Sequence, residues 1–452
     1  MRRFDLLIIG AGSGNSIIGP EHDNWDIAIA ERGLFGGTCL NVGCIPSKMF
    51  VHAAEVAELA RRGPRLGVAT RIDGVDWPAI RDRVFGRIDP IADGGRDYRR
   101  GLENVTVFED TARFVGPKQV AVAGEIITAD RIVLAAGARP LVPDVPGLAD
   151  ARFHTSDTIM RLDHLPRRLV VVGGGYIAAE LGAAFGAFGS EVTFIVRSGR
   201  FLRNEDDDVS MRFTEAYRHR FDVLCETQLL AVDREGDETV LQVSQNGDHR
   251  ELRADALLIA TGRIPNSDDL DVAACGVATD HAGYVVTDDQ LRTSVEGVWA
   301  LGDITNPAQL KHVANHEAKV VAHNLTHPDR PITVDHRFVP HAVFGDPQVA
   351  SVGLTERDCH EQEIPYVAHV QPYASTAFGW ALEDTTSFAK VIAHRETRQL
   401  LGAHIIGPQA STLVQQLIQG MRFGQTVDEM ARGQYYIHPA PPEVIEQALL
   451  EL

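Results

Sequence analysis

Two cysteines five positions apart are the residues of this sequence best suited to chemistry. Cys39 and Cys44 lie in one glycine-containing segment, and Pro46 follows them. Proline suits the first turn of a helix, and an apolar pattern with helical spacing continues after it. We therefore expect Cys44 at a helix N-terminus, where the dipole favours a thiolate, and Cys39 on the preceding loop. A pair with one activated thiol is what thiol–disulfide exchange requires.

Two other interpretations of this pair are a structural disulfide and one half of a zinc site. The remaining cysteines, Cys225, Cys275 and Cys359, are isolated in the sequence. No second close pair completes a zinc site, so we expect no bound metal. Five cysteines in 452 residues do not make the disulfide framework of a secreted protein, which favours a reducing cytoplasm.

Length and charge narrow the class of protein further. A chain of 452 residues is too long for one core and predicts two or three domains. The formal net charge of −19 disfavours nucleic acid or an anionic membrane as a partner. The apolar stretch Leu169–Gly189 is long enough to suggest a membrane span. Its glycine cluster at 173–175 and Glu180 fit a strand, a turn and a helix better, so we expect no membrane span and no targeting signal.

A glycine-rich turn near the start of the chain predicts a dinucleotide site. The turn separates two expected strands, Phe4–Ile9 and Ile27–Ala30, and the second strand ends before an acid. In such a unit the glycines admit a pyrophosphate to a helix N-terminus, and the acid binds the adenosine ribose. Asn15 replaces the third glycine, so the fingerprint is imperfect. The residues assigned to this site are Gly10, Gly12, Ser13, Gly14 and Glu31.

The same pattern recurs in the middle of the chain, which predicts a second dinucleotide. Two expected strands, Leu169–Val172 and Val192–Val196, enclose a turn of three glycines. Ala178 ends this fingerprint and allows close packing of helix and strand. A vestigial copy of the fold is the alternative interpretation. The residues assigned to the second turn are Gly173, Gly175, Tyr176 and Ile177.

Basic residues follow the second copy at the point where an NAD site would have an acid. Arg197, Arg200 and Arg203 lie within seven residues. Guanidinium groups suit the 2′-phosphate of NADPH, because they donate paired hydrogen bonds to phosphate oxygens. A solvated basic face is the alternative.

Taken together, these motifs resemble the flavin-dependent pyridine nucleotide–disulfide oxidoreductases. Arg197 and Arg203 match the phosphate-binding arginines of the NADPH-using members. The segments Ala135–Pro140 and Ala260–Asn266 are similar to the strand-end turns of the family, and Val298–Asp303 resembles its late FAD motif. The resemblance implies an α/β fold with two Rossmann-like dinucleotide-binding domains, one for FAD and one for NADPH, and a C-terminal α+β dimerisation domain.

The resemblance also implies domain boundaries and further cofactor contacts. The FAD-binding domain would be discontinuous and comprise residues 1–145 and 262–337. The NADPH-binding domain would span 146–261, and the interface domain 338–452. In addition to the turn residues, the cofactor contacts would be Gly37, Thr38, Lys48, Gly137 and Asp303 for FAD, and Gly262 for NADPH.

An acid–base pair is expected near the C-terminus. Three prolines close to His438 keep it out of a helix, and Glu443 begins the expected final helix, Glu443–Leu452. A histidine held by a carboxylate is a good general acid–base, although a lone histidine is more often structural. By the resemblance, this pair reaches the dithiol of the partner subunit, so the active site would exist only in a homodimer.

The resemblance implies a role for each remaining site residue. Cys44 would be the thiolate beside the flavin, and Cys39 the thiol that attacks the substrate disulfide. Lys48 and Glu180 match a pair beside the flavin, where a cation stabilises the reduced form; a surface lysine and an ordinary helix glutamate are the alternative. Tyr176 matches a lid over the nicotinamide pocket.

The substrate implied is a small disulfide. No cysteine follows Cys359, which argues against the members that use a C-terminal cysteine pair. No lysine or arginine lies between Arg3 and Arg32, where glutathione-reducing members carry an arginine. The segments 12–16 and 436–440 resemble those of the members that act on mycothione, the disulfide of mycothiol, which implies a role in thiol redox homeostasis.

Three other functions remain open. The first is a dihydrolipoamide dehydrogenase, an NAD-linked component of a 2-oxo acid dehydrogenase complex, which Arg197 opposes. The second is a reductase of another small disulfide. The third is a flavoprotein without catalysis, which the full set of cysteines, histidine and glutamate opposes.

Overall fold

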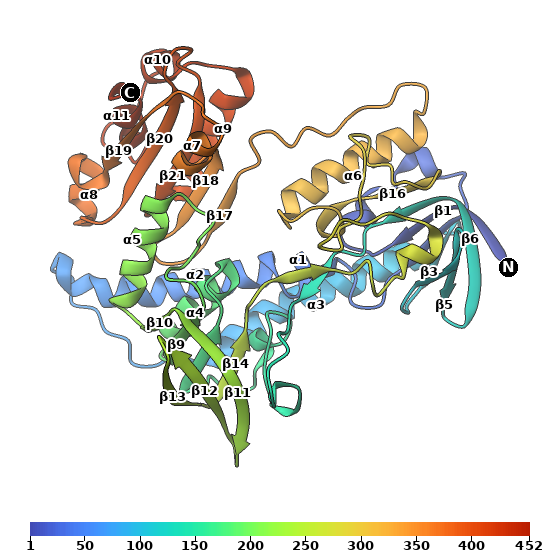
Figure 1. The fold of residues 1–452 in the computed structure, drawn as a ribbon, viewed down its shortest axis with the longest axis horizontal. Helices are drawn as coiled ribbons and strands as arrows, with labels where there is room; N and C mark the ends of the chain where they lie inside the picture. Colours follow the sequence, from blue (N-terminus) through green and yellow to red (C-terminus); the bar gives the residue numbers. More distant parts are fainter.

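The computed structural model describes residues 1–452 and contains three main sheets (Figure 1). The first sheet has the strand order β3-β2-β1-β6-β5-β4, and β16 also pairs with β6. Its parallel strands hold the N-terminal nucleotide turn; in their register Ile8 lies opposite both Ile29 and Val133. The strands are β1 (Arg2–Ile9), β2 (Ile27–Ala30), β3 (Val105–Phe108), β4 (Arg113–Gly116), β5 (Gln119–Val122), β6 (Glu125–Leu134) and β16 (Val298–Ala300).

The helix expected after the first glycine turn is reduced to a short 3₁₀ helix, η1 (Ser13–Ser16). Pro20 begins a second 3₁₀ helix, η2 (Pro20–His22). Proline disfavours a helical conformation at the residue before it, so a continuous helix does not form. The helix N-terminus expected at the pyrophosphate is therefore that of this short 3₁₀ helix.

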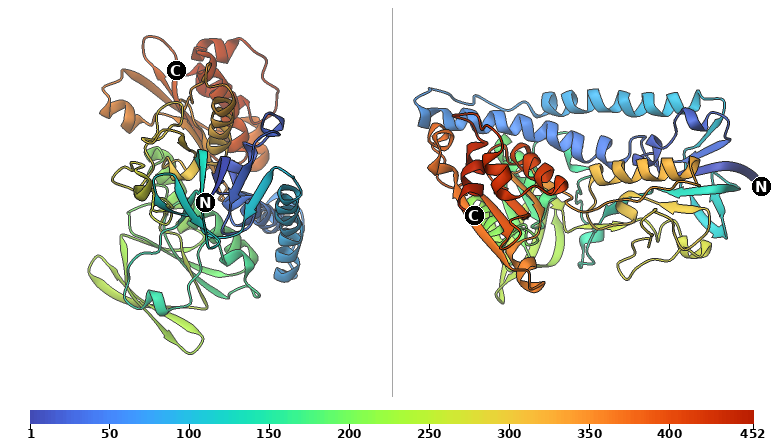
Figure 2. Two further views of the ribbon diagram at one scale, coloured as in Figure 1. Left: turned by 90° about the vertical axis from the view of Figure 1, so that its right-hand side faces the viewer. Right: turned by 90° about the horizontal axis from the view of Figure 1, so that it is seen from above.

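Two long helices follow the dithiol segment and run side by side (Figure 2). Helix α1 (Gly37–Asn41) precedes α2 (Cys44–Arg62), and α3 (Trp77–Arg100) begins where the Asp76 carboxylate accepts a hydrogen bond from the Ala79 amide (2.9 Å). Such an N-cap stabilises the first turn of a helix. Phe50 of α2 stacks on Trp77 with ring centroids 5.3 Å apart, which fixes α2 against α3.

The second sheet is parallel throughout and has the order β10-β9-β8-β14. Helix α4 (Tyr176–Phe188) covers it closely, because a Cβ at Gly182 would lie 2.3 Å from the Phe194 ring. An antiparallel ribbon, β11-β12-β13, extends from this sheet. The elements are β8 (Arg168–Val172), β9 (Glu191–Val196), α5 (Asp207–Arg218), β10 (Asp222–Cys225), β11 (Thr227–Glu235), β12 (Glu238–Gln245), β13 (Asp248–Ala254) and β14 (Ala256–Ile259).

The C-terminal sheet is antiparallel, with the order β17-β18-β21-β20-β19. Helices α9 and α11 pack on it. The elements are β17 (His341–Val343), β18 (Val349–Gly353), α7 (Glu356–Glu361), β19 (Tyr366–Pro372), α8 (Ala377–Leu382), β20 (Phe388–His394), β21 (Leu400–Ile406), α9 (Ala410–Phe423), α10 (Val427–Arg432) and α11 (Glu443–Leu450).

Two smaller features join these regions. Strands β7 (Ala138–Pro140) and β15 (Arg263–Pro265) form an antiparallel pair, and α6 (Lys311–Thr326) packs on η1.

A buried lysine of the C-terminal sheet, Lys390, is only 2% exposed and forms ion pairs with Asp206 (2.7 Å), Asp208 (2.6 Å) and Glu356. This charge cluster connects the start of α5 to the C-terminal sheet.

The predicted α/β fold with two Rossmann-like units and a C-terminal α+β region is confirmed. The predicted residue boundaries of the three domains stay a prediction. None of the helices combines the length and the apolar character that crossing a membrane requires.

Candidate active site

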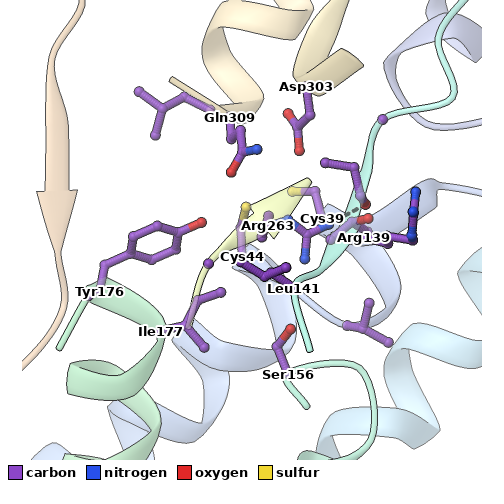
Figure 3. Close-up of a pocket in the computed structure, with 18 of the residues that line it drawn as sticks. Cys39, Cys44, Arg139, Leu141, Ser156, Tyr176, Ile177, Arg263, Asp303 and Gln309 are labelled. Atoms are coloured by element: carbon purple, nitrogen blue, oxygen red, sulfur yellow. Dashed lines mark hydrogen bonds between the residues drawn. The ribbon is translucent and has the colours of Figure 1, made fainter. Parts of the chain in front are cut away.

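One cavity of about 1570 Å³ is lined by both nucleotide turns and by the dithiol. Cys39 and Cys44 lie on its wall together with Tyr176 and Asp303 (Figure 3). The two predicted dinucleotide sites and the predicted redox pair therefore share one continuous space, although they lie far apart in the sequence.

The two glycine turns are built on the same close approach of backbone to backbone. Gly10 has a φ of 106°, and a Cβ there would lie 2.3 Å from the Ala135 carbonyl oxygen. Gly173 has a φ of 144°, and a Cβ there would lie 2.2 Å from the Ala260 oxygen. Any side chain at either position would collide with the end of a neighbouring strand, so only glycine fits.

A third close approach brings the dithiol segment to the first turn. Gly37 has a φ of 62°, and a Cβ on it would lie 2.8 Å from the Cα of Gly12. Helix α1 therefore starts directly against the first nucleotide turn. The local sequence around the cysteines is held at the cofactor site by two glycines that are 25 positions apart in the numbering.

The predicted acid of the first site caps the nucleotide turn. One carboxylate oxygen of Glu31 accepts a hydrogen bond from the Ala11 amide (2.7 Å), and the other accepts one from the Gly33 amide (2.8 Å). The side chain also lines the cavity. An adenosine ribose needs a fixed acid, and a pyrophosphate needs a glycine-rich turn that it can approach closely. These residues therefore fit a flavin dinucleotide.

Asp303, the acid of the late motif, lies in the cavity on η7 (Gly302–Ile304). Burial raises its pKa, which Arg263 and Lys311 partly oppose. The fully buried Glu317 positions this turn by accepting hydrogen bonds from the Gly302 amide (2.6 Å) and from Asn306 (3.0 Å). Sequence reasoning missed Glu317, because no motif marks a supporting carboxylate on a following helix.

Asn15, the departure from the fingerprint, has a structural role. Its side-chain oxygen accepts a hydrogen bond from Arg99 Nε (2.8 Å), and its carbonyl accepts one from the same guanidinium (2.7 Å). Arg99 is 8% exposed and lies near the end of α3. Asn15 thus holds the first turn against α3. The presence of asparagine where the fingerprint has glycine is the sequence signal that could have indicated this contact.

The dithiol lies at a helix boundary, but not entirely as predicted. Cys44 is the first residue of α2, as expected, whereas Cys39 lies within helix α1 and not on a loop. Gly36 and Gly37 have positive φ angles and turn the chain into this short helix. Both thiols are free and accessible to the cavity.

Each of the two thiols changes the pKa of the other. A hydrogen bond from Cys44 lowers the pKa of Cys39 to about 7, and Lys311 contributes to this lowering. The same bond, together with burial and the adjacent sulfur, raises the pKa of Cys44 above its usual range. These pKa shifts belong to the pair of sulfurs and not to either thiol alone, and the predicted thiolate at Cys44 stays a prediction.

Lys311, a residue that sequence reasoning missed, connects the first turn to the dithiol. It is the first residue of α6, and its ammonium donates a hydrogen bond to Ser13 Oγ (2.8 Å). Ser13 Oγ in turn lies 3.1 Å from Asn315 Oδ1. Nothing in the local sequence distinguishes this lysine from a surface residue, since its partner lies 298 positions away.

Lys48 and Glu180 lie in the same region without forming a direct ion pair. The Lys48 ammonium pairs with Glu55 (3.4 Å) and lies 4.4 Å from the centre of the Phe344 ring. Glu180 is buried and accepts a hydrogen bond from the Phe344 amide (2.9 Å). Burial raises the pKa of Glu180 to about 7, although this amide and the charge of Lys48 oppose the shift.

Tyr176 opens helix α4 at the second glycine turn, where Ile177 follows it. Its side chain is 43% exposed and extends across the cavity on the side of Cys44 (Figure 3). Such a position allows the ring to swing over a bound ligand. Its predicted role as a lid stays a prediction.

The two arginines predicted to bind the 2′-phosphate are free of acidic partners. Arg197 and Arg203 are exposed, line the cavity, and have no carboxylate within 4.0 Å. Arg200, between them, is paired with Asp207 (2.5 Å). Two guanidinium groups without acidic partners after β9 form a site that can bind an anion, in a protein of strongly negative charge. Gly137, Gly262 and Thr38 also lie on the cavity wall.

His438 and Glu443 form the predicted pair but do not reach the cysteines within this chain. His438 Nδ1 lies 2.6 Å from Glu443 Oε1. The His438 side chain is 72% exposed, and neither residue lines the cavity that holds the dithiol. The carboxylate orients the imidazole and leaves its second nitrogen, Nε2, free to face another molecule.

Comparison with known proteins agrees with this geometry. Residues 4–318 match the family described as pyridine nucleotide-disulphide oxidoreductase, and residues 339–449 match its dimerisation domain. The chain belongs to this family. It is a flavin-dependent disulfide oxidoreductase that uses a pyridine nucleotide, and its dimerisation domain supports assembly as a homodimer.

Individual members of the family give a finer comparison. The chain is 47% identical to a mycothione reductase of Mycobacterium tuberculosis over the full length of both proteins. It is 33% identical to a mercuric reductase of Staphylococcus aureus, with 94% of this chain and 78% of the relative covered. The copper(II) complex of the HOCl-induced flavoprotein disulfide reductase RclA of Escherichia coli superposes with a TM-score of 0.88 at 25% identity, and all of both chains is covered.

Replacing Asn15 by the glycine of the usual fingerprint should destabilise the folded protein. We expect Asn15→Gly to reduce the free energy of unfolding by about 1–3 kcal/mol, because the buried Arg99 guanidinium loses a side-chain acceptor. Urea denaturation of the flavin-loaded protein measures the change. Asn15→Ala separates the loss of the amide from backbone effects, and a double-mutant cycle with Arg99→Met gives the coupling. A cycle without coupling energy would contradict the proposed contact.

The acidity of Cys39 should depend on Cys44. In Cys44→Ala the donor to the Cys39 thiolate is lost, so the pKa of Cys39 should rise from about 7 toward its usual value near 9.0. The pH dependence of Cys39 alkylation in the reduced protein, followed by peptide mass spectrometry, measures this pKa. Cys359→Ala, which removes a buried cysteine of α7, is the control and should leave the profile unchanged. An unshifted profile in Cys44→Ala would mean that the two thiols do not share a proton.

Proposed function

We propose that this oxidoreductase uses NADPH and FAD to reduce mycothione to two molecules of mycothiol, and so maintains the thiol pool of a reducing cytoplasm. The substrate rests on the 47% identity to a mycothione reductase over the whole of both chains. The choice of nucleotide rests on Arg197 and Arg203, which line the cavity without acidic partners. The overall reaction consumes one NADPH and one proton for each disulfide that is cleaved.

We assign the nucleotides to the two glycine turns. FAD would lie on the first turn, with its ribose at Glu31 and its flavin end toward Asp303 and Lys48. NADPH would lie on the second turn, with its 2′-phosphate at Arg197 and Arg203. The corresponding division is an FAD-binding domain of residues 1–145 and 262–337, an NADPH-binding domain of 146–261, and an interface domain of 338–452.

The chemistry needs both a carrier of electrons and a pair of sulfurs. When bound, FAD would supply the conversion of a two-electron hydride from NADPH into reduction of the Cys39–Cys44 disulfide. Cys39 is the nucleophile toward the substrate, since its pKa of about 7 makes the thiolate available at neutral pH. Its sulfur forms a mixed disulfide with one half of the substrate as the first mycothiol thiolate leaves.

The second half of the reaction regenerates the pair. Cys44 attacks the Cys39 sulfur, the mixed disulfide breaks, and the second thiol departs. His438 of the partner subunit accepts the proton of Cys39 and later protonates the departing thiolate. Glu443 orients this imidazole through the 2.6 Å contact to Nδ1. Lys48 supplies positive charge beside the flavin site, and Tyr176 covers the nicotinamide pocket until the nucleotide enters.

Two rival functions make different demands on the nucleotide and on the dithiol. A dihydrolipoamide dehydrogenase would use NAD⁺ and would favour an acid where this chain has Arg197. A non-catalytic flavoprotein would not need an accessible dithiol with a proton shared between its sulfurs.

Steady-state rates test the proposal directly. NADPH oxidation should be fastest with mycothione among a panel of mycothione, glutathione disulfide, lipoamide and cystine, and NADH should be the weaker donor. Faster turnover of dihydrolipoamide with NAD⁺ would replace the proposal with the dehydrogenase. Failure of NADPH to bleach the flavin absorbance would indicate a protein without reductase activity.

Replacing Arg197 should weaken the preference for NADPH over NADH. Glutamate at this position places a negative charge against the 2′-phosphate and offers an acceptor to a ribose hydroxyl. In Arg197→Glu the ratio of kcat/KM for NADPH to that for NADH should fall at least about tenfold, which corresponds to about 1.4 kcal/mol. Arg200→Glu is the matched control, because Arg200 is already paired with Asp207. A ratio that stays constant in Arg197→Glu would exclude this arginine as the selective residue.

Subunit mixing tests whether two chains build each active site. Cys39→Ser and His438→Ala are each expected to be inactive. After dissociation and random reassociation, about half of the dimers are mixed, and each has one site with intact Cys39 and intact His438. Activity should recover to about a quarter of the wild-type value if the two-fold related sites are independent. A mixture as inactive as its parents would mean that His438 acts within its own chain.

A further inference from the structure

The loop that carries Arg203 is attached to the molecule on both sides of this arginine. On one side, the Leu202 amide donates a hydrogen bond to the carbonyl of Gly174 in the second nucleotide turn (2.8 Å). On the other side lies Glu205, whose amide bonds back to the Leu202 carbonyl (2.9 Å). Arg203 therefore lies in a tight turn, and the position of its backbone depends on both of these neighbours.

The carboxylate and the carbonyl of Glu205 accept hydrogen bonds from the C-terminal part of the chain. His341 Nε2 donates a hydrogen bond to one carboxylate oxygen (2.6 Å), and the Ser351 hydroxyl donates one to the other (2.5 Å). Arg357 donates to the Glu205 carbonyl (3.0 Å). The three donors come from β17, β18 and α7, whereas Glu205 precedes α5 beside the second sheet.

Because Glu205 is buried, its carboxylate depends on these hydrogen bonds to stay in place. The residue is only 6% exposed, so its carboxylate has little access to water. A buried carboxylate that loses its donors bears the cost of an unpaired charge and tends to move toward solvent. Because Glu205 lies two residues after Arg203, such a movement displaces the guanidinium from the cavity. The carboxylate stays charged in this setting: despite burial, the His341 bond holds the pKa of Glu205 below its usual value.

We propose that His341 is a positioning residue for nucleotide selectivity: through Glu205 it fixes the turn that presents Arg203 to the nucleotide 2′-phosphate. This inference rests on the proposed use of NADPH. It adds that the C-terminal region determines nucleotide selectivity from outside the nucleotide-binding fold. His341 does not need to touch the nucleotide for this effect, since its contact is with Glu205.

Binding of two adenine nucleotides to the flavin-loaded, oxidised protein isolates this effect from catalysis. Adenosine 2′,5′-bisphosphate carries the 2′-phosphate, whereas ADP lacks it, and isothermal titration calorimetry measures both affinities. In His341→Ala the bisphosphate should bind about tenfold more weakly, and ADP should bind within about twofold of wild type, because only the phosphate contact is displaced. His341→Gln keeps an N–H donor at a similar reach and should recover most of the loss.

Further variants separate positioning from folding. Ser351→Ala removes the other donor to Glu205 with little change of shape, and should weaken bisphosphate binding in the same direction even if His341→Ala does not fold. His369→Ala is the matched control, since the side chain of this histidine of the same sheet is hydrogen-bonded to Gln371 of its own strand and not to Glu205. Steady-state kinetics should agree, with a raised KM for NADPH at unchanged kcat in His341→Ala.

Two outcomes would overturn the proposal, and both are distinct from a failure of the proposed function. Unchanged bisphosphate affinity in His341→Ala and Ser351→Ala would exclude the positioning role. Equal losses for the bisphosphate and ADP would show a general structural role instead. Arg203→Met tests the underlying contact: if this variant binds the bisphosphate as tightly as wild type, Arg203 does not hold the 2′-phosphate and the positioning role of His341 fails, whereas the NADPH assignment is tested separately at Arg197.

Discussion

Close contact between backbone atoms is the constraint on which the rest of the structure depends. At Gly10 and at Gly173 the chain passes so near a neighbouring strand end that a Cβ would lie 2.3 or 2.2 Å from a carbonyl oxygen. The two carbonyls belong to Ala135 and Ala260, which directly follow strands β6 and β14 of the two sheets. Both turns line the same cavity. The close approach of Gly37 to Gly12 brings the dithiol segment against the first turn.

The sequence was sufficient for features that repeat locally and insufficient for those that depend on distant partners. Strand β2 has the predicted limits, Ile27–Ala30, since its apolar run is bounded by polar residues. Strand β1 begins at Arg2, two residues earlier than predicted, because Arg2 and Arg3 pair with the opposite strand β6. No apolar pattern could reveal that extension, which depends on a partner more than 100 residues away.

The candidate site divides in the same way. The cysteines, the glycines and the arginines are marked by their types and spacing, and the structure gathers them in one cavity. The residues that adjust them carry no such mark. Lys311 contacts Ser13, and Arg99 contacts Asn15, across separations of 298 and 84 positions. The acidity of the dithiol depends on the contact between its two sulfurs and on the charge of Lys311, and only the folded geometry reveals these neighbours.

The ion cluster around Lys390 has a consequence for how the molecule responds to heat. Its ammonium is buried among three carboxylates: Asp206 and Asp208 at the start of α5, and Glu356 of α7. Separating the second sheet from the C-terminal sheet would break these three ion pairs together. We therefore expect the two regions to unfold in one cooperative step, with partial opening of the molecule beginning elsewhere in the chain.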